Sequence, residues 1–107
     1  MSREEAIELI ERMEFIPAIQ GPNDKYRIGC YKAAADSKEP LEWIRVIKTH
    51  YLRTHTASGE IRTVHAQETE YATVVKSLLE KELANALNIQ EEEVGAYIKK
   101  RLDDSWN

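Results

Sequence analysis

The C-terminal third of the chain carries the pattern that most constrains the fold. From residue 71 to residue 87, apolar side chains recur three and four positions apart, and neither glycine nor proline interrupts them. The stripe comprises Tyr71, Val74, Val75, Leu78, Leu79, Leu83, Ala86 and Leu87. This spacing predicts an amphipathic helix of about five turns with one broad apolar face to bury.

A second helix is predicted directly after the first. Asn88 can adopt the left-handed conformation that ends a helix, and Ile89 and Val94 stand at the two positions of a hydrophobic staple. The expected buried face of the second helix comprises Val94, Tyr97, Ile98 and Leu102. Two helices joined by so short a turn are expected to form an αα-corner.

The N-terminal segment predicts a further helix. Ser2 and Glu5 have the spacing of a capping box, and apolar residues follow at helical spacing, so we expect a helix over residues 2–13. After it, Pro17 removes a backbone donor, so residues 15–19 are expected to form a short edge strand or an extended arm.

The middle of the chain is rich in β-branched and aromatic residues. Residues 26–31, 43–55 and 60–66 are therefore expected to be strands, the last two forming a hairpin. We thus predict an α+β fold, in which an antiparallel β-meander of three or four strands spans about residues 15 to 66. An alternative for residues 41–52 stays open, because Leu41, Ile44, Ile47 and Tyr51 also fit a helical stripe.

Composition and length predict one soluble domain over residues 1–107. With 42% apolar and 32% charged residues, the chain can bury a core, and disordered and coiled-coil compositions are excluded. The apolar runs are too short to span a membrane, and the first five residues are too acidic for a signal peptide. Cys30 is the one cysteine, which favours a reducing compartment, so a cytoplasmic location is expected.

Charge is unevenly distributed along the chain. Residues 15–65 carry eight Lys or Arg against five Asp or Glu and hold all three histidines, whereas both flanking segments are acidic. A basic centre in a chain of net charge −4 suggests that the centre meets an anionic group.

The predicted hairpin places aromatic and cationic side chains on one sheet face. A turn at residues 56–60 sets Tyr51 opposite His65, and strand alternation extends that face back to residue 43. The candidate partner-binding residues on this face are Trp43, Arg45, Tyr51, Arg53, His55 and His65. Trp, Tyr and Arg are the usual anchors of protein interfaces, and such a face can also stack on bases.

The two C-terminal helices carry a second candidate site. The run from Leu83 to Ile89, followed by Val94 and Ile98, resembles the helix-turn-helix of DNA-binding regulators over residues 82–102. That resemblance implies contact between the second helix and DNA. Residues 91–93 are all glutamate at the start of that helix, and carboxylates repel phosphates, so the pattern favours a structural αα-corner.

No pattern in the chain indicates catalysis, a cofactor or a metal. Nucleophile elbows, phosphate-binding glycine loops and metalloprotease motifs are missing, and His50 and His55 would lie on opposite strand faces. We therefore expect a non-catalytic binding module that regulates or inhibits a larger macromolecule through protein contacts. The alternative is a nucleic-acid-associated regulator that uses the basic centre, residues 43–65, or the degenerate helix-turn-helix.

The breadth of the C-terminal apolar stripe predicts self-association. Adjacent apolar pairs make the stripe wider than one contact line, and two-fold dimers are the commonest oligomers. We expect a homodimer through residues 71–106, with an interface that includes Val75, Leu79, Tyr97 and Trp106.

Overall fold

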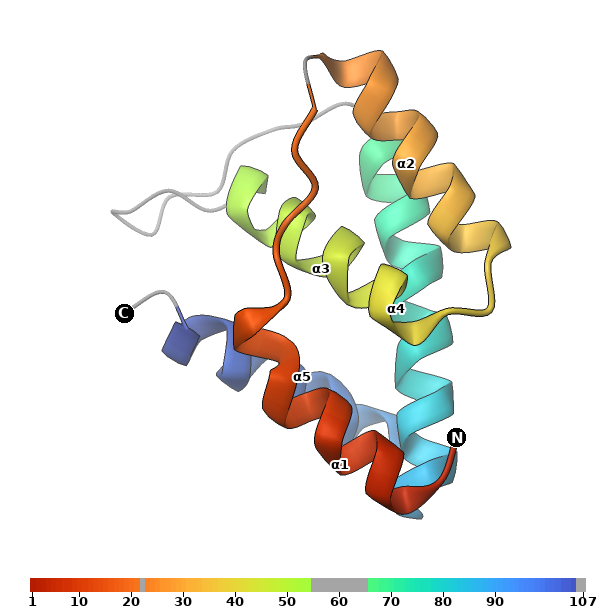
Figure 1. Ribbon diagram of the computed structural model, residues 1–107. Helices are drawn as coiled ribbons and strands as arrows, with labels where there is room; N and C mark the ends of the chain where they lie inside the picture. The colour runs from red at the N-terminus through yellow and green to blue at the C-terminus, as the bar shows by residue number, and fades with distance from the viewer. Residues whose placement is uncertain (22, 55–65, 106–107) are drawn as a thin grey trace.

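The protein is helical throughout the residues that the structure, a computed structural model, describes: 1–21, 23–54 and 66–105 (Figure 1). The helices are α1 (Arg3–Arg12), the short 3-10 helix η1 (Met13–Phe15), α2 (Asp24–Asp36), α3 (Pro40–Thr54), α4 (Ala66–Leu87) and α5 (Glu91–Ser105). No strand occurs within these ranges, and none of these helices has the length and apolar character needed to cross a membrane.

The predicted α+β fold and its β-meander are therefore wrong. Residues 26–31 lie in α2 and residues 43–54 lie in α3. The predicted hairpin turn and the second strand up to residue 65 fall outside the described residues, and residue 66, the end of that strand, begins α4. Residues 17–21 form an extended arm, without strand pairing. The helices expected near the two ends of the chain are present, and Asn88 has the expected positive φ, of 56°.

Helix α2 forms because its start is capped and one face is buried. The Asn23 side chain accepts a hydrogen bond from the backbone N–H of Tyr26 at 2.8 Å, as an N-cap residue does. Arg27, Tyr31 and Ala34 are buried at spacings of four and three, which is one helical face. The predicted strand over residues 26–31 was wrong because it relied on strand propensity and not on this helical spacing.

Helix α3 is buried on most of its circumference. Its buried residues are Trp43, Ile44, Val46, Ile47, Lys48 and Thr49. Its β-branched and aromatic composition favours a strand, although its apolar residues also recur at helical spacing. Pro40 begins the helix, a position where its missing N–H costs nothing. The helical alternative for residues 41–52 is thus confirmed.

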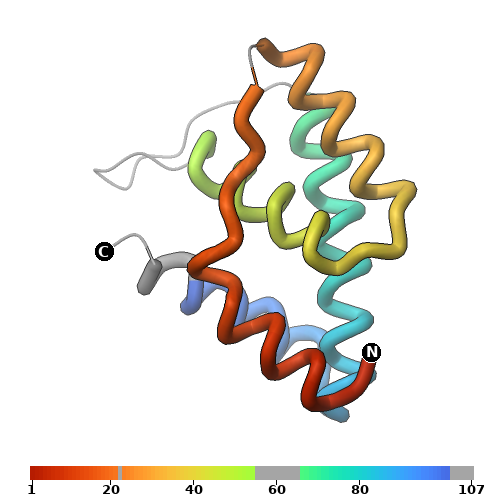
Figure 2. The backbone as a smooth tube through the Cα atoms, in the orientation of Figure 1, coloured from red at the N-terminus to blue at the C-terminus, as the bar shows by residue number. Residues whose placement is uncertain are grey.

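Helix α4 is the centre of the fold. It packs against α1, α2, α3 and α5, and the tube trace shows it running the height of the molecule, with α2 beside one end and α1 and α5 near the other (Figure 2). Val75, Leu79 and Leu83 on its inner face are fully buried. Its end is closed by a hydrogen bond from the Ile89 N–H to the Ala84 carbonyl at 3.1 Å, the bond that follows a left-handed cap residue.

A buried ion cluster fixes α2, α3 and α4 relative to one another. Glu68, near the start of α4, is 0% exposed, and Arg27 of α2 donates from Nε to its Oε1 at 2.5 Å. Arg53 of α3 donates to Oε2 at 3.3 Å, and its Nε lies 3.0 Å from Oε1 as an ion-pair contact. Asp24 pairs with both arginines from the solvent side.

The cluster keeps the Glu68 carboxylate ionised. Burial would raise the pKa of Glu68, but the hydrogen bonds and positive charges of Arg27 and Arg53 outweigh burial, so its pKa lies below the usual value. Tyr31 is buried beside the cluster, and burial together with the charge of Glu68 raises the pKa of its phenol, which therefore stays neutral.

A second buried cation holds the arm against α3. The Lys48 ammonium donates to the carbonyls of Met13, Glu14 and Ile16 at 2.9, 3.1 and 2.7 Å, where η1 ends. Thr49 accepts a hydrogen bond from the Ile19 N–H at 2.7 Å, so the arm is held where it crosses α3, as Figure 2 shows. A lysine at this place satisfies carbonyls that a helix end leaves unpaired.

We predict that Lys48→Met destabilises the protein although methionine has a similar length. The carbonyls of Glu14 and Ile16 lose the Lys48 donor, whereas that of Met13 keeps the Ile16 N–H at 3.4 Å. Leaving buried acceptors unsatisfied costs about 1–3 kcal/mol. Urea denaturation of the variant should show this loss in the free energy of unfolding. Lys32→Met, at an exposed position of α2, should stay within about 0.5 kcal/mol of the wild type. Equal effects of the two substitutions would contradict the role of Lys48.

We also predict an acid-sensitive step that depends on Glu68. Its pKa is lowered on folding, so the unfolded chain binds the proton first and stability falls as the pH drops below about 4.5. Between about pH 6 and pH 3, Glu68→Gln should therefore lose less free energy of unfolding than the wild type. Glu70→Gln, an exposed control on the same helix, should follow the wild-type curve. A Glu68→Gln curve parallel to the wild type would be inconsistent with the ion cluster.

Candidate functional site

An open pocket of about 590 Å³ lies between α3, α4 and α5, and we name it the central pocket. Its lining residues are Ile47, His50, Tyr51 and Thr54 of α3, Ala72, Thr73 and Lys76 of α4, and Glu92, Gly95, Ala96, Ile98 and Lys99 of α5. A volume of this size falls within the range of about 300–1,000 Å³ that is typical of ligand and anchor pockets.

Small residues on two helices create the space. Ala72 of α4 and Gly95 and Ala96 of α5 line the pocket where larger side chains would fill it. Among residues 91–101 of α5, Val94 and Ile98 are buried, each 2% exposed. Arg101 adds a hydrogen bond to the Ile10 carbonyl at 3.2 Å, which ties the end of α5 to α1.

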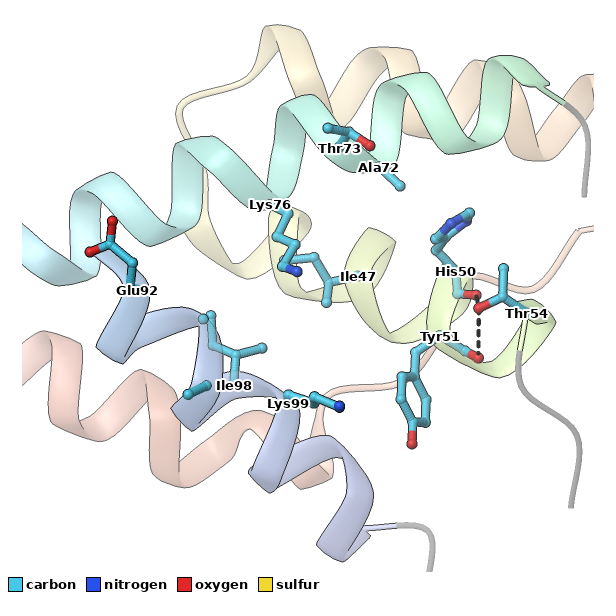
Figure 3. Close-up of a pocket in the computed structure, with 12 residues that line it drawn as sticks. Ile47, His50, Tyr51, Thr54, Ala72, Thr73, Lys76, Glu92, Ile98 and Lys99 are labelled. Atoms are coloured by element: carbon cyan, nitrogen blue, oxygen red, sulfur yellow. Dashed lines mark hydrogen bonds between the residues drawn. The ribbon is translucent and has the colours of Figure 1, made fainter. Parts of the chain in front are cut away.

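Polar groups surround an apolar floor. Figure 3 shows His50, Tyr51 and Thr54 at one end of the pocket and Glu92 at the other, with Lys76 and Lys99 between them. The floor includes the buried side chains of Ile47 and Ile98. An apolar centre surrounded by a polar rim is also the arrangement that is typical of protein interfaces.

Electrostatics differ between the two ends of the pocket. The Lys76 ammonium lies 3.9 Å from the Glu80 carboxylate; burial raises the pKa of Glu80, the charge of Lys76 lowers it, and the charges of Glu91 and Glu92 raise it. The exposed glutamates 91–93 place negative charge at this end. Lys99 is exposed two turns after Glu92 on α5, so it places a cation nearer the end that Tyr51 lines.

The Thr54 hydroxyl in the pocket is bound to the backbone of its own helix. Thr54 donates to the carbonyls of His50 and Tyr51 at 2.9 and 3.3 Å (Figure 3). In the described part of the chain, no three His, Cys, Asp or Glu side chains are grouped so that they could hold a metal ion.

The structure separates the residues predicted to form one binding face. Trp43 is buried, and its indole N–H donates to the Ala34 carbonyl at 3.0 Å. Arg45 lies at the arm, with its Nε 3.4 Å from the Pro17 carbonyl. Tyr51 lines the central pocket and Arg53 pairs with Glu68. His55 and His65 lie outside the described residues.

Trp43, Arg45, Tyr51 and Arg53 share no sheet face, because α3 turns about 100° per residue where a strand would alternate. The αα-corner is present in α4 and α5, and the three glutamates of residues 91–93 are exposed at the start of α5.

The residues predicted for a homodimer interface lie at different depths. Val75 and Leu79 are 0% exposed, inside the core of a single chain. Tyr97 is 51% exposed on α5, and Trp106 lies outside the described residues. The homodimer itself stays a prediction.

Sequence reasoning missed most of the central pocket. Thr73 and Lys76, like Ala96 and Lys99, are three residues apart on their helices, so each pair shares a helix face. The signal in α3 is Ile47, Tyr51 and Thr54 at spacings of four and three. These residues share one face only if residues 41–54 form a helix, whereas a strand was predicted there.

Comparison of the chain with protein-family models, with curated proteins and with solved structures gives no match.

Proposed function

We propose that the protein is a small non-catalytic binding module that regulates or inhibits a larger macromolecule, and that its partner is a protein. The observation that carries this proposal is the central pocket, with its apolar floor of Ile47 and Ile98 and its rim of Tyr51, Lys76 and Lys99. A partner's apolar side chain can enter the pocket while a carboxylate beside it pairs with a rim lysine.

Rigid support of the pocket favours binding. Tyr51 is one turn from Lys48 and two residues from Arg53, whose buried or paired cations fix α3 at the arm and at α4. A preformed site loses less conformational entropy when a partner binds, so a small interface can still be tight.

The use of the basic residues weighs against the nucleic-acid alternative. That alternative relied on the excess of positive charge in residues 15–65, but Arg27 and Lys48 are buried and Arg53 pairs with Glu68. Cations engaged inside the chain release no counterions from a phosphate backbone.

We still expect a cytoplasmic location, because a lone cysteine, Cys30, suits a reducing compartment.

We predict that Ala96→Arg strongly weakens partner binding. Ala96 is exposed and lines the pocket, and arginine is a good helix former, so the long side chain fills the pocket without unfolding α5. Affinity capture from the native host should recover a protein with the wild type and lose it with Ala96→Arg. Binding of that purified protein, measured by calorimetry, should weaken at least about tenfold.

The matched control is Ala33→Arg, the same substitution at an exposed position of α2. It should bind as the wild type does. If no recovered protein distinguishes the two variants, the central pocket is not a protein-binding site. Recovery of nucleic acid that weakens steeply with rising salt would instead support the alternative.

A further inference from the structure

A second groove, of about 260 Å³, lies on the opposite side of α5 from the central pocket, between α1, the end of α4 and α5. From α1 it is lined by Arg3, Ile7, Ile10 and Glu11, which lie along one helix face. Ile7 is 40%, Ile89 37% and Tyr97 51% exposed around it. Three large apolar side chains are thus open to solvent at one place.

The charges of this face are opposite at its two ends. Arg3 stands in the first turn of α1 and Glu11 in its last, about 12 Å apart along the axis. Within the described ranges, neither side chain forms an ion pair or a hydrogen bond. Ile7 is midway between them in the sequence.

Both charges oppose the helix dipole. The N-terminus of a helix favours anions and the C-terminus favours cations, and Glu4, Glu5 and Arg12 of α1 follow this rule. Arg3 and Glu11 do not, and these two are the charges that line the groove. Their placement therefore costs the isolated chain stability, which an interaction outside the chain can offset.

We propose that the groove binds a second copy of this chain, with the two α1 helices packed antiparallel around a two-fold axis at Ile7. Antiparallel pairing centred on Ile7 sets position 3 of one copy opposite position 11 of the other. Arg3 then pairs with Glu11 of the second copy, and the same pair forms again by symmetry. Ile7 packs against Ile7 of the second copy, and Tyr97 covers the side of the contact.

This surface differs from the dimer expected from the sequence, which used Val75 and Leu79 of the core. It shares Tyr97 with that expectation. The proposal does not rest on the function proposed above, because no residue of the central pocket except Ile98 lines this groove.

The test is charge exchange followed by sedimentation equilibrium on the full chain at about 100 µM protein. The wild type should have twice the monomer mass of 12.4 kDa. Arg3→Glu and Glu11→Arg should each raise the dimer dissociation constant about tenfold or more, because each puts like charges in contact at two symmetric places. The double variant Arg3→Glu/Glu11→Arg should restore the dimer.

A loss of the dimer in these variants should not result from unfolding. Each substitution brings the end of α1 into agreement with the helix dipole, so circular dichroism should show an unchanged helix content. Lys32→Glu, a charge reversal on α2, is the control and should remain dimeric. A wild type of 12.4 kDa, single variants that stay dimeric, or a double variant that stays monomeric would each overturn the proposal.

Discussion

The whole arrangement depends on one carboxylate that no solvent reaches. Glu68 is 0% exposed, and an ion in that position is tolerated only if cations and hydrogen bonds surround it. Arg27 and Arg53 supply these from α2 and α3, so three helices must meet at one point. Because α4 also packs against α1 and α5, this point orients the helix on which the rest of the core is assembled.

The same constraint gives the basic middle of the chain its role. Lys48 holds the arm, and Arg27 and Arg53 neutralise Glu68, so much of the positive charge acts inside the molecule. The surface also carries a pocket with two lysines on its rim and a separate groove with opposite charges at its ends. We propose that the pocket contacts a different protein and the groove a copy of the chain.

The sequence predicted the helices whose apolar spacing had no competing strand signal, and it failed for α2 and α3, whose composition favours strands. Residues 71–87 repeat at helical spacing, and Asn88 ends α4 with its left-handed backbone. In α3, Ile44, Ile47 and Tyr51 also keep a helical spacing, but the β-branched and aromatic composition favoured a strand. Pairing of Arg53 with a glutamate 15 positions away could not be read from local spacing. The central pocket was missed because its wall in α3 was taken for a strand.

A double-mutant cycle between Glu68 and Arg27 measures the central interaction most directly. The free energy of unfolding would be obtained for the wild type, Glu68→Gln, Arg27→Met and the double variant by urea denaturation at neutral pH. If the buried cluster organises the fold, each single variant leaves a buried group uncompensated, and the double variant should be more stable than the sum of the single effects implies. We predict a coupling energy above about 1 kcal/mol. Effects that add to within about 0.5 kcal/mol would show that the two side chains act independently, and would contradict this account.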